Sequence, residues 1–131
     1  MKKFLLVSLL SIFLIVILAI YNSQLRSKLP TVERLIEFEN GATDIDPNTT
    51  ELSFIFTEEM NTYYSNFEIG PLGEDYSFRI LDGDFSDDKK TYKIRFKLEP
   101  NKKYQLEIGV GFRTKKEVRI NPYLIEFTTG S

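Results

Sequence analysis

The chain has 131 residues, with 17 basic and 19 acidic side chains and neither histidine nor cysteine. The lack of those two residue types excludes disulfide bonds, nucleophiles of the Ser-His or Cys-His kind, and the imidazole or thiolate ligands of most zinc sites. Aromatic residues make up 14% of the chain, and together with many β-branched residues they favour strands over helices. No cofactor and no nucleic-acid partner are predicted.

An unbroken apolar stretch runs from Phe4 to Tyr21, directly after a pair of lysines. A membrane-spanning helix needs about twenty apolar residues, whereas shorter stretches are more often the core of a signal peptide. Ala19 has no second small residue at the spacing that a cleavage site requires. We therefore predict that residues 1–21 are an uncleaved transmembrane anchor. A cleaved signal sequence, which would make the protein secreted, is the alternative.

Positive charge lies at both ends of this stretch. Lys2, Lys3 and the amino terminus favour a cytoplasmic N-terminus, although Arg26 and Lys28 flank the other end. We expect a single-pass membrane protein whose C-terminal domain is extracytoplasmic.

Beyond a predicted linker, residues 22–31, one domain is expected over residues 32–131. Apolar and polar residues alternate along it, which is typical of strands with one face in a core and the other in water. The expected strands are 35–39, 52–57, 65–69, 76–80, 92–98, 104–110 and 123–127. Seven short strands separated by turn residues predict an all-β, seven-stranded immunoglobulin-like sandwich of Greek-key topology behind one N-terminal membrane helix.

A proline turn precedes the strand that Tyr104 opens, in the stretch Leu98-Glu-Pro-Asn-Lys-Lys-Tyr104. This is the pattern of a tyrosine corner, in which the phenol hydroxyl bonds to backbone upstream. We predict such a bond for Tyr104.

Several stretches along the domain carry a resemblance to a known family. Asn40-Gly-Ala-Thr-Asp-Ile-Asp-Pro and Phe54-Ile-Phe-Thr-Glu-Glu-Met-Asn61 resemble the opening of the bacterial Ig-like domain found in S-layer and other surface proteins, and Asp88-Lys-Lys-Thr-Tyr, the Tyr104 stretch and Glu126-Phe-Thr-Thr129 agree with its second half. The resemblance covers the chain from about Val32 onwards and implies a fold and a bacterial surface location, with hardly any indication of activity. Residues 109–122 depart from the family's Asp/Gly-rich loop, because they are basic here.

Charge is divided along the domain, with acidic residues dominating residues 32–88 and basic residues dominating residues 89–119. One interpretation is a basic surface for an anionic partner. The other is that neighbouring strands carry complementary charges on their solvent faces. The candidate binding residues are Lys93, Arg95, Lys97, Arg113, Lys115, Lys116 and Arg119.

Four carboxylates lie within seven residues of a predicted loop, at Asp82, Asp84, Asp87 and Asp88. Clusters of oxygen ligands suit calcium, which makes these four a weak candidate site. The alternative is an Asp-rich turn, because aspartate favours turns through local backbone bonds.

The sequence as a whole predicts a non-catalytic structural or protein-binding module of a bacterial envelope, held at the membrane by the stretch from Phe4 to Tyr21, with an envelope protein as partner. The alternative is that the basic residues bind an anionic envelope polymer or lipid headgroups. A two-carboxylate hydrolase is a distant third hypothesis, since no pair of acids is placed by the sequence.

Overall fold

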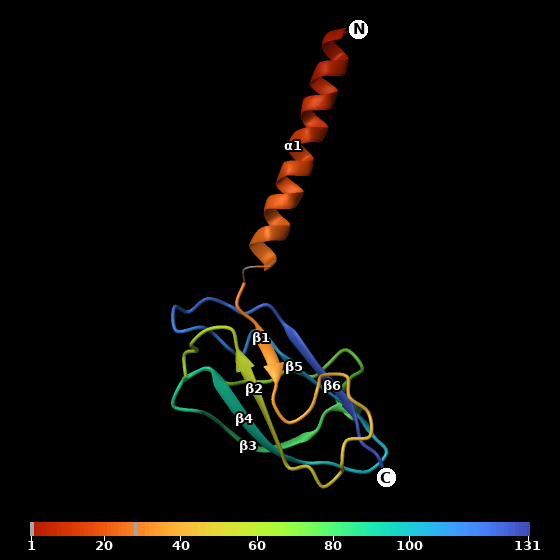
Figure 1. Cartoon of the computed structure of the whole chain (residues 1–131), viewed down its shortest axis with the longest axis vertical. Helices are drawn as coiled ribbons and strands as arrows, with labels where there is room; N and C mark the ends of the chain where they lie inside the picture. The colour runs from red at the N-terminus through yellow and green to blue at the C-terminus, as the bar shows by residue number, and fades with distance from the viewer. Residues whose placement is uncertain (1, 28) are drawn as a thin grey trace.

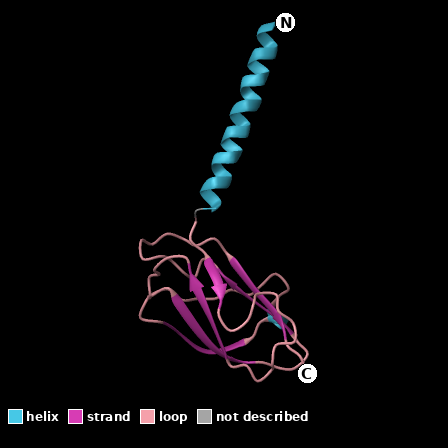
Figure 2. Cartoon of the chain, in the orientation of Figure 1, coloured by secondary structure: helices cyan, strands magenta, loops and turns pink. Residues whose placement is uncertain are grey.

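The computed structural model describes residues 2–27 and 29–131, without the side chains of Phe4 and of residues 25–27. Lys28 and the side chain of Arg26, on which the expected membrane orientation partly depends, lie outside the described residues. Figure 2 shows one long helix followed by a domain of strands and loops.

Helix α1, Lys2–Ser27, stands away from the β domain (Figure 1). Its large apolar side chains are exposed wherever they are described, whereas the core helix of a soluble protein buries such a surface. Among the described residues, Leu5–Gln24 is the one helical stretch long and apolar enough to cross a membrane, and a signal sequence passes the same test. The helix continues past Tyr21, so the predicted linker is helical as far as Ser27 and residues 28–31 alone lead to the first strand.

In the described part of the chain, six strands form two antiparallel sheets. The first sheet has the order β1-β2-β4-β3, and the second pairs β5 with β6. The bounds are β1 Val32–Leu35, β2 Glu51–Phe56, β3 Arg79–Phe85, β4 Thr91–Lys97, β5 Lys103–Ile108 and β6 Tyr123–Thr128, with a short 3-10 helix η1 at Glu74–Tyr76. Inward side chains of both sheets share one hydrophobic core, so the domain is sandwich-like.

Four predicted strands, 52–57, 92–98, 104–110 and 123–127, are confirmed to within two residues by β2, β4, β5 and β6. The one predicted at 35–39 lies earlier, as β1, because the chain leaves the sheet after Leu35. There the Glu37 carboxylate accepts a hydrogen bond from the Ser53 N–H at 2.6 Å, in place of a backbone carbonyl. The strand predicted at 76–80 begins only at Arg79.

The prediction of a seventh strand at residues 65–69 is wrong. The segment lies beside β5 with one isolated bridge, in which the N–H groups of Glu68 and Glu107 donate to each other's carbonyl at 3.0 and 2.9 Å. The pairing is short because β5 ends at Ile108 and the chain turns over the sheet face at Gly70. A Cβ there would lie 2.6 Å from Gln105 Oε1, so only glycine fits this approach.

The loop predicted around Asp82-Gly83-Asp84 is also wrong, because these residues belong to β3. Asp82 and Asp84 pair with cationic residues of β4, and such opposite charges offset the low strand propensity of aspartate. Gly83 leaves room for the ring of Tyr92, which a Cβ would approach to 2.6 Å.

Aromatic rings fill the core in two groups. The group nearer α1 contains Phe54, Phe56, Phe67, Phe85, Tyr92 and Phe112, and the other contains Phe38, Phe78, Phe96, Tyr104 and Phe127. Phe112 is fully buried although it belongs to the loop between β5 and β6. Its ring centroid lies 5.2 Å from that of Phe67 and 5.3 Å from that of Phe56, distances at which aromatic pairs stabilise beyond simple burial.

The β domain has two distinct ends along its strands (Figure 1). Loops 57–66, 86–90 and 109–122 lie at the end next to α1, called the α1 end below. Loops 36–50, 70–78 and 98–102 lie toward the opposite end, called the far end, where the C-terminus also lies.

The predicted hydrogen bond of Tyr104 to upstream backbone is confirmed. The Glu99 N–H donates to the Tyr104 phenol oxygen at 2.7 Å, and the Thr129 hydroxyl donates to the Glu99 carbonyl at 2.6 Å. Tyr104 and Thr129 are both buried. The turn between β4 and β5 is thereby fixed to the end of β6.

Asn40 covers the outer edge of β6. Its amide donates to the Leu124 carbonyl at 2.7 Å and accepts from the Glu126 N–H at 2.8 Å. The Gly41 N–H then donates to the Glu126 carbonyl at 2.7 Å. Backbone groups of an open sheet edge are thus occupied within the same chain, which blunts pairing with other molecules.

We expect Tyr104→Phe to lower the free energy of unfolding by about 1 kcal/mol, because the Glu99 N–H loses a partly buried acceptor. Thermal and urea denaturation of the full chain in detergent micelles, followed by near-ultraviolet circular dichroism, would measure the change. Tyr63→Phe is the control, since Tyr63 is 92% exposed and its hydroxyl is hydrated. Equal effects of the two substitutions would contradict the role of Tyr104.

Asn40→Ala should cost about 1–2 kcal/mol in the same assay, because it removes both side-chain hydrogen bonds to β6. Asn48→Ala, in the same loop, is the control and should change stability by no more than about 0.5 kcal/mol. A neutral Asn40→Ala would show that water replaces the amide at this edge without loss.

Candidate binding surface

Two of the cations predicted to bind a partner lie among carboxylates on the outer face of the first sheet. The Arg95 Nε is 3.3 Å from Glu51 Oε1 and its Nη1 is 3.2 Å from Asp82 Oδ2. The Lys93 Nζ is 3.6 Å from Glu51 Oε2. Hydrogen bonds to Glu51 and Asp82 raise the pKa of Arg95 above its usual range. Lys93 and Arg95 therefore fit the second interpretation, in which neighbouring strands carry complementary charges.

Lys97 has a different setting at the end of β4. Its cross-strand neighbour is Arg79, a like charge. Both residues line a depression of about 380 Å³ together with Lys102 and Tyr104. Lys102 is already paired with Glu99, at 3.6 Å between Nζ and Oε2.

The other four predicted cations, Arg113, Lys115, Lys116 and Arg119, lie on loop 109–122 at the α1 end. The Arg113 guanidinium sits 5.0 Å from the Tyr64 ring centroid, a cation–π distance. The Lys115 Nζ is 3.4 Å from Glu59 Oε2. Thr114 is fully buried and its hydroxyl oxygen accepts from the Val118 N–H at 3.0 Å. The loop is thus a tight turn with an exposed tip at residues 115–119.

The structure places the seven predicted cations in two locations, the outer face of β4 and loop 109–122. Within the first location, Lys93 and Arg95 are matched by acids. Among the described residues, Lys97, Lys116 and Arg119 form no ion pair, whereas Lys115 is held by Glu59.

Two of the four aspartates of the weak calcium candidate, Asp82 and Asp88, have different partners. Asp82 faces Arg95, whereas Asp88 accepts hydrogen bonds from the Ser86 hydroxyl and from the Lys90 and Thr91 N–H groups. Over the described residues, no group of three or more acidic side chains is arranged to hold a metal ion. Asp88 acts as the cap of the β3–β4 turn, as the alternative interpretation expected for an Asp-rich turn.

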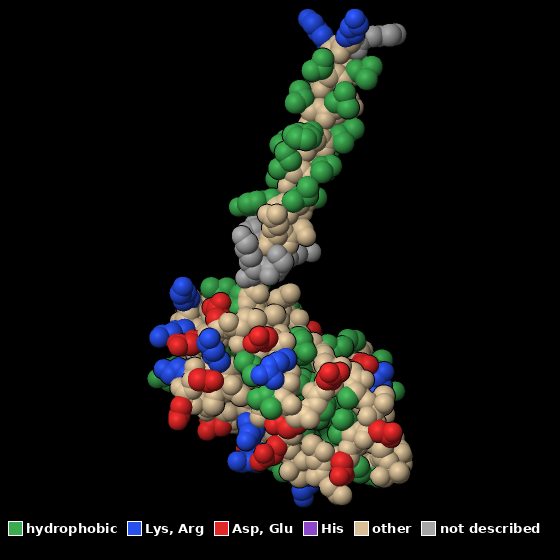
Figure 3. Space-filling model, in the orientation of Figure 1, with side chains coloured by type: hydrophobic (Ala, Val, Ile, Leu, Met, Phe, Trp, Pro, Cys, Tyr) green, Lys and Arg blue, Asp and Glu red, His purple; other side chains and the backbone are tan. Residues whose placement is uncertain are grey.

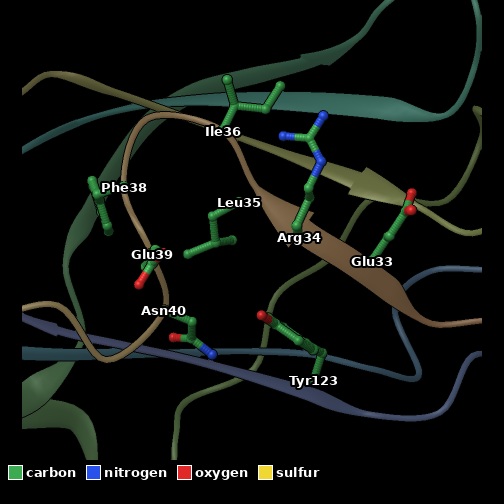
Figure 4. Close-up of a pocket in the computed structure, with 8 residues that line it drawn as sticks. All are labelled: Glu33, Arg34, Leu35, Ile36, Phe38, Glu39, Asn40 and Tyr123. Atoms are coloured by element: carbon green, nitrogen blue, oxygen red, sulfur yellow. The ribbon is translucent and has the colours of Figure 1, made fainter.

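A groove of about 420 Å³ opens between the edges of the two sheets, at β1 and β6 (Figure 4). Its residues are Glu33, Arg34, Leu35, Ile36, Phe38, Glu39, Asn40 and Tyr123. Figure 4 shows the Tyr123 hydroxyl pointing toward the gap from β6, with Arg34 on the β1 side. Because β1 is the last strand of its sheet, its outer edge faces this groove.

The groove combines apolar surface with one cation and two acids, which suits an extended peptide better than a reaction. Peptides bind such edges by adding a strand, with side chains in adjacent pockets. The groove residues were not among the predicted site residues, because the groove forms only when β1 and β6, which are distant in sequence, come together. The alternation around Tyr123 was the one local signal of its position.

No family model matches this chain. A search of curated proteins likewise finds no significant match.

Solved structures of one protein share the fold. Surface layer protein SbsC, domains 1-6, matches with a TM-score of 0.56 and 20% identity, over 78% of this chain and 14% of that chain. The S-layer protein rSbsC(31-844) matches with a TM-score of 0.56 and 20% identity, over 86% of this chain and 15% of that chain. The N-terminal part of the bacterial S-layer protein SbsC matches with a TM-score of 0.56 and 19% identity, over 79% of this chain and 24% of that chain. The chain therefore spans between 14% and 24% of the proteins it resembles. At this identity the likeness establishes the fold alone.

The hydrogen bonds of Asp88 predict that the stability of the domain depends on pH. The Ser86 hydroxyl first, and then the Lys90 and Thr91 N–H groups, lower the pKa of Asp88 to about 2. An aspartate in an unfolded chain titrates near 3.9, so ionised Asp88 stabilises the fold above about pH 4, and this stabilisation is lost as the pH falls to about 2. We expect Asp88→Asn to destabilise the protein at pH 7, with the difference from wild type shrinking from pH 4 to pH 2.

Urea titrations at several pH values in micelles would measure that difference. Ser86→Ala removes the largest cause of the lowered pKa and should reproduce part of the effect. A wild-type and Asp88→Asn difference that is constant between pH 7 and pH 2 would contradict the assignment.

Proposed function

We propose that this chain is a non-catalytic, Ig-type structural module of the bacterial cell surface, held at the membrane by α1. The observation that carries the proposal is a fold shared with surface layer protein SbsC, preceded by an exposed apolar helix long enough to span a bilayer.

Strand order supports the Ig type. Constant-type Ig domains have one sheet of strands A, B, E and D and a second of C, F and G. The order β1-β2-β4-β3 matches the first set, and segment 65–69, β5 and β6 occupy the places of the second. Tyr104 opens β5, the F position, where Ig domains carry their tyrosine corner.

A structural role is supported by how the acidic and basic groups are used. Glu51 and Asp82 hold Arg95, Glu59 holds Lys115, and Asp88 caps a turn. The acids of the groove, Glu33 and Glu39, are exposed, whereas a general acid for glycoside hydrolysis needs an environment that raises its pKa. The carboxylates of Glu51, Asp82, Glu59 and Asp88 thus make contacts within the domain.

The partner that we propose is an envelope protein, with the groove between β1 and β6 as its docking place. The exposed β1 edge would accept an extended segment, and Leu35 and Phe38 would supply apolar contacts. The alternative, an anionic polymer on the outer face of β4, is less favoured because Glu51 and Asp82 already neutralise Arg95.

Membrane fractionation tests the tether. The full chain, produced in bacterial cells, should remain in membranes after alkaline carbonate extraction and keep the mass of an uncleaved polypeptide. Leu10→Arg with Leu14→Arg should release it, because each arginine near the helix centre opposes insertion by about 2.5–3.5 kcal/mol. Leu10→Ala with Leu14→Ala is the control and should stay bound. A shortened chain in the medium would contradict the tether and indicate a signal peptide.

A further inference from the structure

We propose that the α1 end of the β domain docks on anionic phospholipid headgroups of the membrane that holds α1, through the tip of loop 109–122 and the neighbouring Tyr63. This inference rests on the proposed tether. It adds a second, reversible contact that sets how the domain lies on the bilayer.

The connection between helix and domain is short and its domain side is fixed. Asn121 N–H donates to the Pro30 carbonyl at 2.7 Å, and the Thr31 hydroxyl donates to the Asn121 carbonyl at 2.9 Å. The Thr31 N–H also donates to Thr57 Oγ1 at 3.0 Å. The chain therefore enters the domain against loop 109–122, so this loop is brought to the membrane with the tether.

The distance leaves little freedom. From Gln24, the last residue of the apolar span, the helix rises about 1.5 Å per residue to Ser27, and residues 28–31 reach at most about 14 Å when extended. The headgroup layer takes up about 5–7 Å of this span. The α1 end is thus held within roughly 15 Å of the headgroups, close to the 8–10 Å over which charges act in physiological salt.

The loops of the α1 end form one braced surface. The Lys115 N–H donates to the Glu59 carbonyl at 2.9 Å and the Asn61 N–H to the Arg113 carbonyl at 2.8 Å, which joins loops 57–66 and 109–122. The Met60 N–H donates to the Lys89 carbonyl at 2.9 Å and brings in loop 86–90. A surface held in this way loses little conformational freedom when it binds.

Charge distinguishes the two ends. The α1-end loops carry six cations and five acids, namely Lys89, Lys90, Arg113, Lys115, Lys116 and Arg119 with Glu58, Glu59, Asp87, Asp88 and Glu117. The far-end loops carry one cation and seven acids, namely Lys102 with Glu37, Glu39, Asp44, Asp46, Glu74, Asp75 and Glu99. An anionic bilayer repels the far end and tolerates only the α1 end at close range. Figure 3 shows lysine and arginine side chains interspersed with acidic ones at the domain end beside the helix.

The tip has the composition of a headgroup-binding loop. Residues 115–119 are all exposed and include three cations around Val118, which is 42% exposed. Tyr63, on the adjacent loop 57–66, is 92% exposed. Tyrosine is favoured at the membrane interface because its ring prefers the headgroup layer while its hydroxyl stays hydrated. A protein partner for this tip would be an alternative occupant, and the following test separates the two.

The test uses the full chain in lipid nanodiscs made either of phosphatidylcholine alone or of phosphatidylcholine with phosphatidylglycerol, each doped with a headgroup-linked gadolinium lipid. NMR line broadening is measured at the amides of Tyr63, Lys116 and Val118, and at Ala42 and Gly130 of the far end. We expect the first set to broaden more strongly in anionic discs than in neutral ones, with the excess removed by 0.5 M salt and the far end unaffected. Broadening that is absent, or equal in the two lipids, would overturn the proposal.

Paired charge variants supply the specificity control. Lys115→Gln with Lys116→Gln should lower the docked-to-undocked ratio by about fivefold per lysine. Lys97→Gln with Lys103→Gln removes the same charge next to far-end loop 98–102, where Lys103 is ion-paired with Glu126 as Lys115 is with Glu59, and should leave docking intact. Equal loss in both pairs would overturn the assignment to the tip, as would a loss in the second pair alone.

Co-elution of the chain with the discs reports the tether separately. A chain that does not co-elute contradicts the proposed tether and the docking with it. A chain that co-elutes without lipid-dependent broadening contradicts the docking alone.

Discussion

The α1 end of this domain depends on Phe112. A long loop between β5 and β6 has no ladder of its own to order it, yet the side chain of Phe112 is fully buried among rings of the first sheet and Phe67. Removing such a ring from a core costs about 3–5 kcal/mol, which is enough to hold an entire loop in place. Once Phe112 is packed in the core, backbone hydrogen bonds from the Lys115 N–H to the Glu59 carbonyl and from the Asn61 N–H to the Arg113 carbonyl join loop 57–66 to loop 109–122. The entry of the chain at Pro30 and Thr31 is fixed to the same loop.

Alternation of apolar and polar residues predicted the strands that have one face in solvent. It failed where contacts with residues distant in sequence determine the structure. Phe112 lies within a basic stretch without period-two alternation, so no pattern indicated that it is a core residue. Asp82 and Asp84 have the composition of a turn, and their place in β3 follows from cations on a strand that is adjacent in space only. The segment at 65–69 has the composition of a strand, but because the chain turns at Gly70 it forms one isolated bridge to β5. Tyr104 was predictable because its partner lies five residues upstream.

The candidate site was predictable in composition and unpredictable in arrangement. The sequence separates acidic from basic residues along the chain, yet folding interleaves the two halves in the first sheet, where Glu51 and Asp82 surround Arg95. The folded domain keeps an asymmetry of charge between its two ends, and this asymmetry depends on which loops lie at the same end. That information is topological: it follows from strand direction and connection, and no local window of sequence contains it. The groove between β1 and β6 has the same origin.

The chain enters the β domain at one end and reaches its C-terminus at the other, with β1 and β6 running in the same direction (Figure 1). A pulling force applied between these two points is directed along the strands. The hydrogen bonds of the β1–β2 ladder would then be loaded together, in shear, and would not open one after another like a zipper. Tyr104 and Thr129 brace the point where the force would leave the domain. The architecture is therefore suited to carrying mechanical tension along its strands, from one end of the domain to the other.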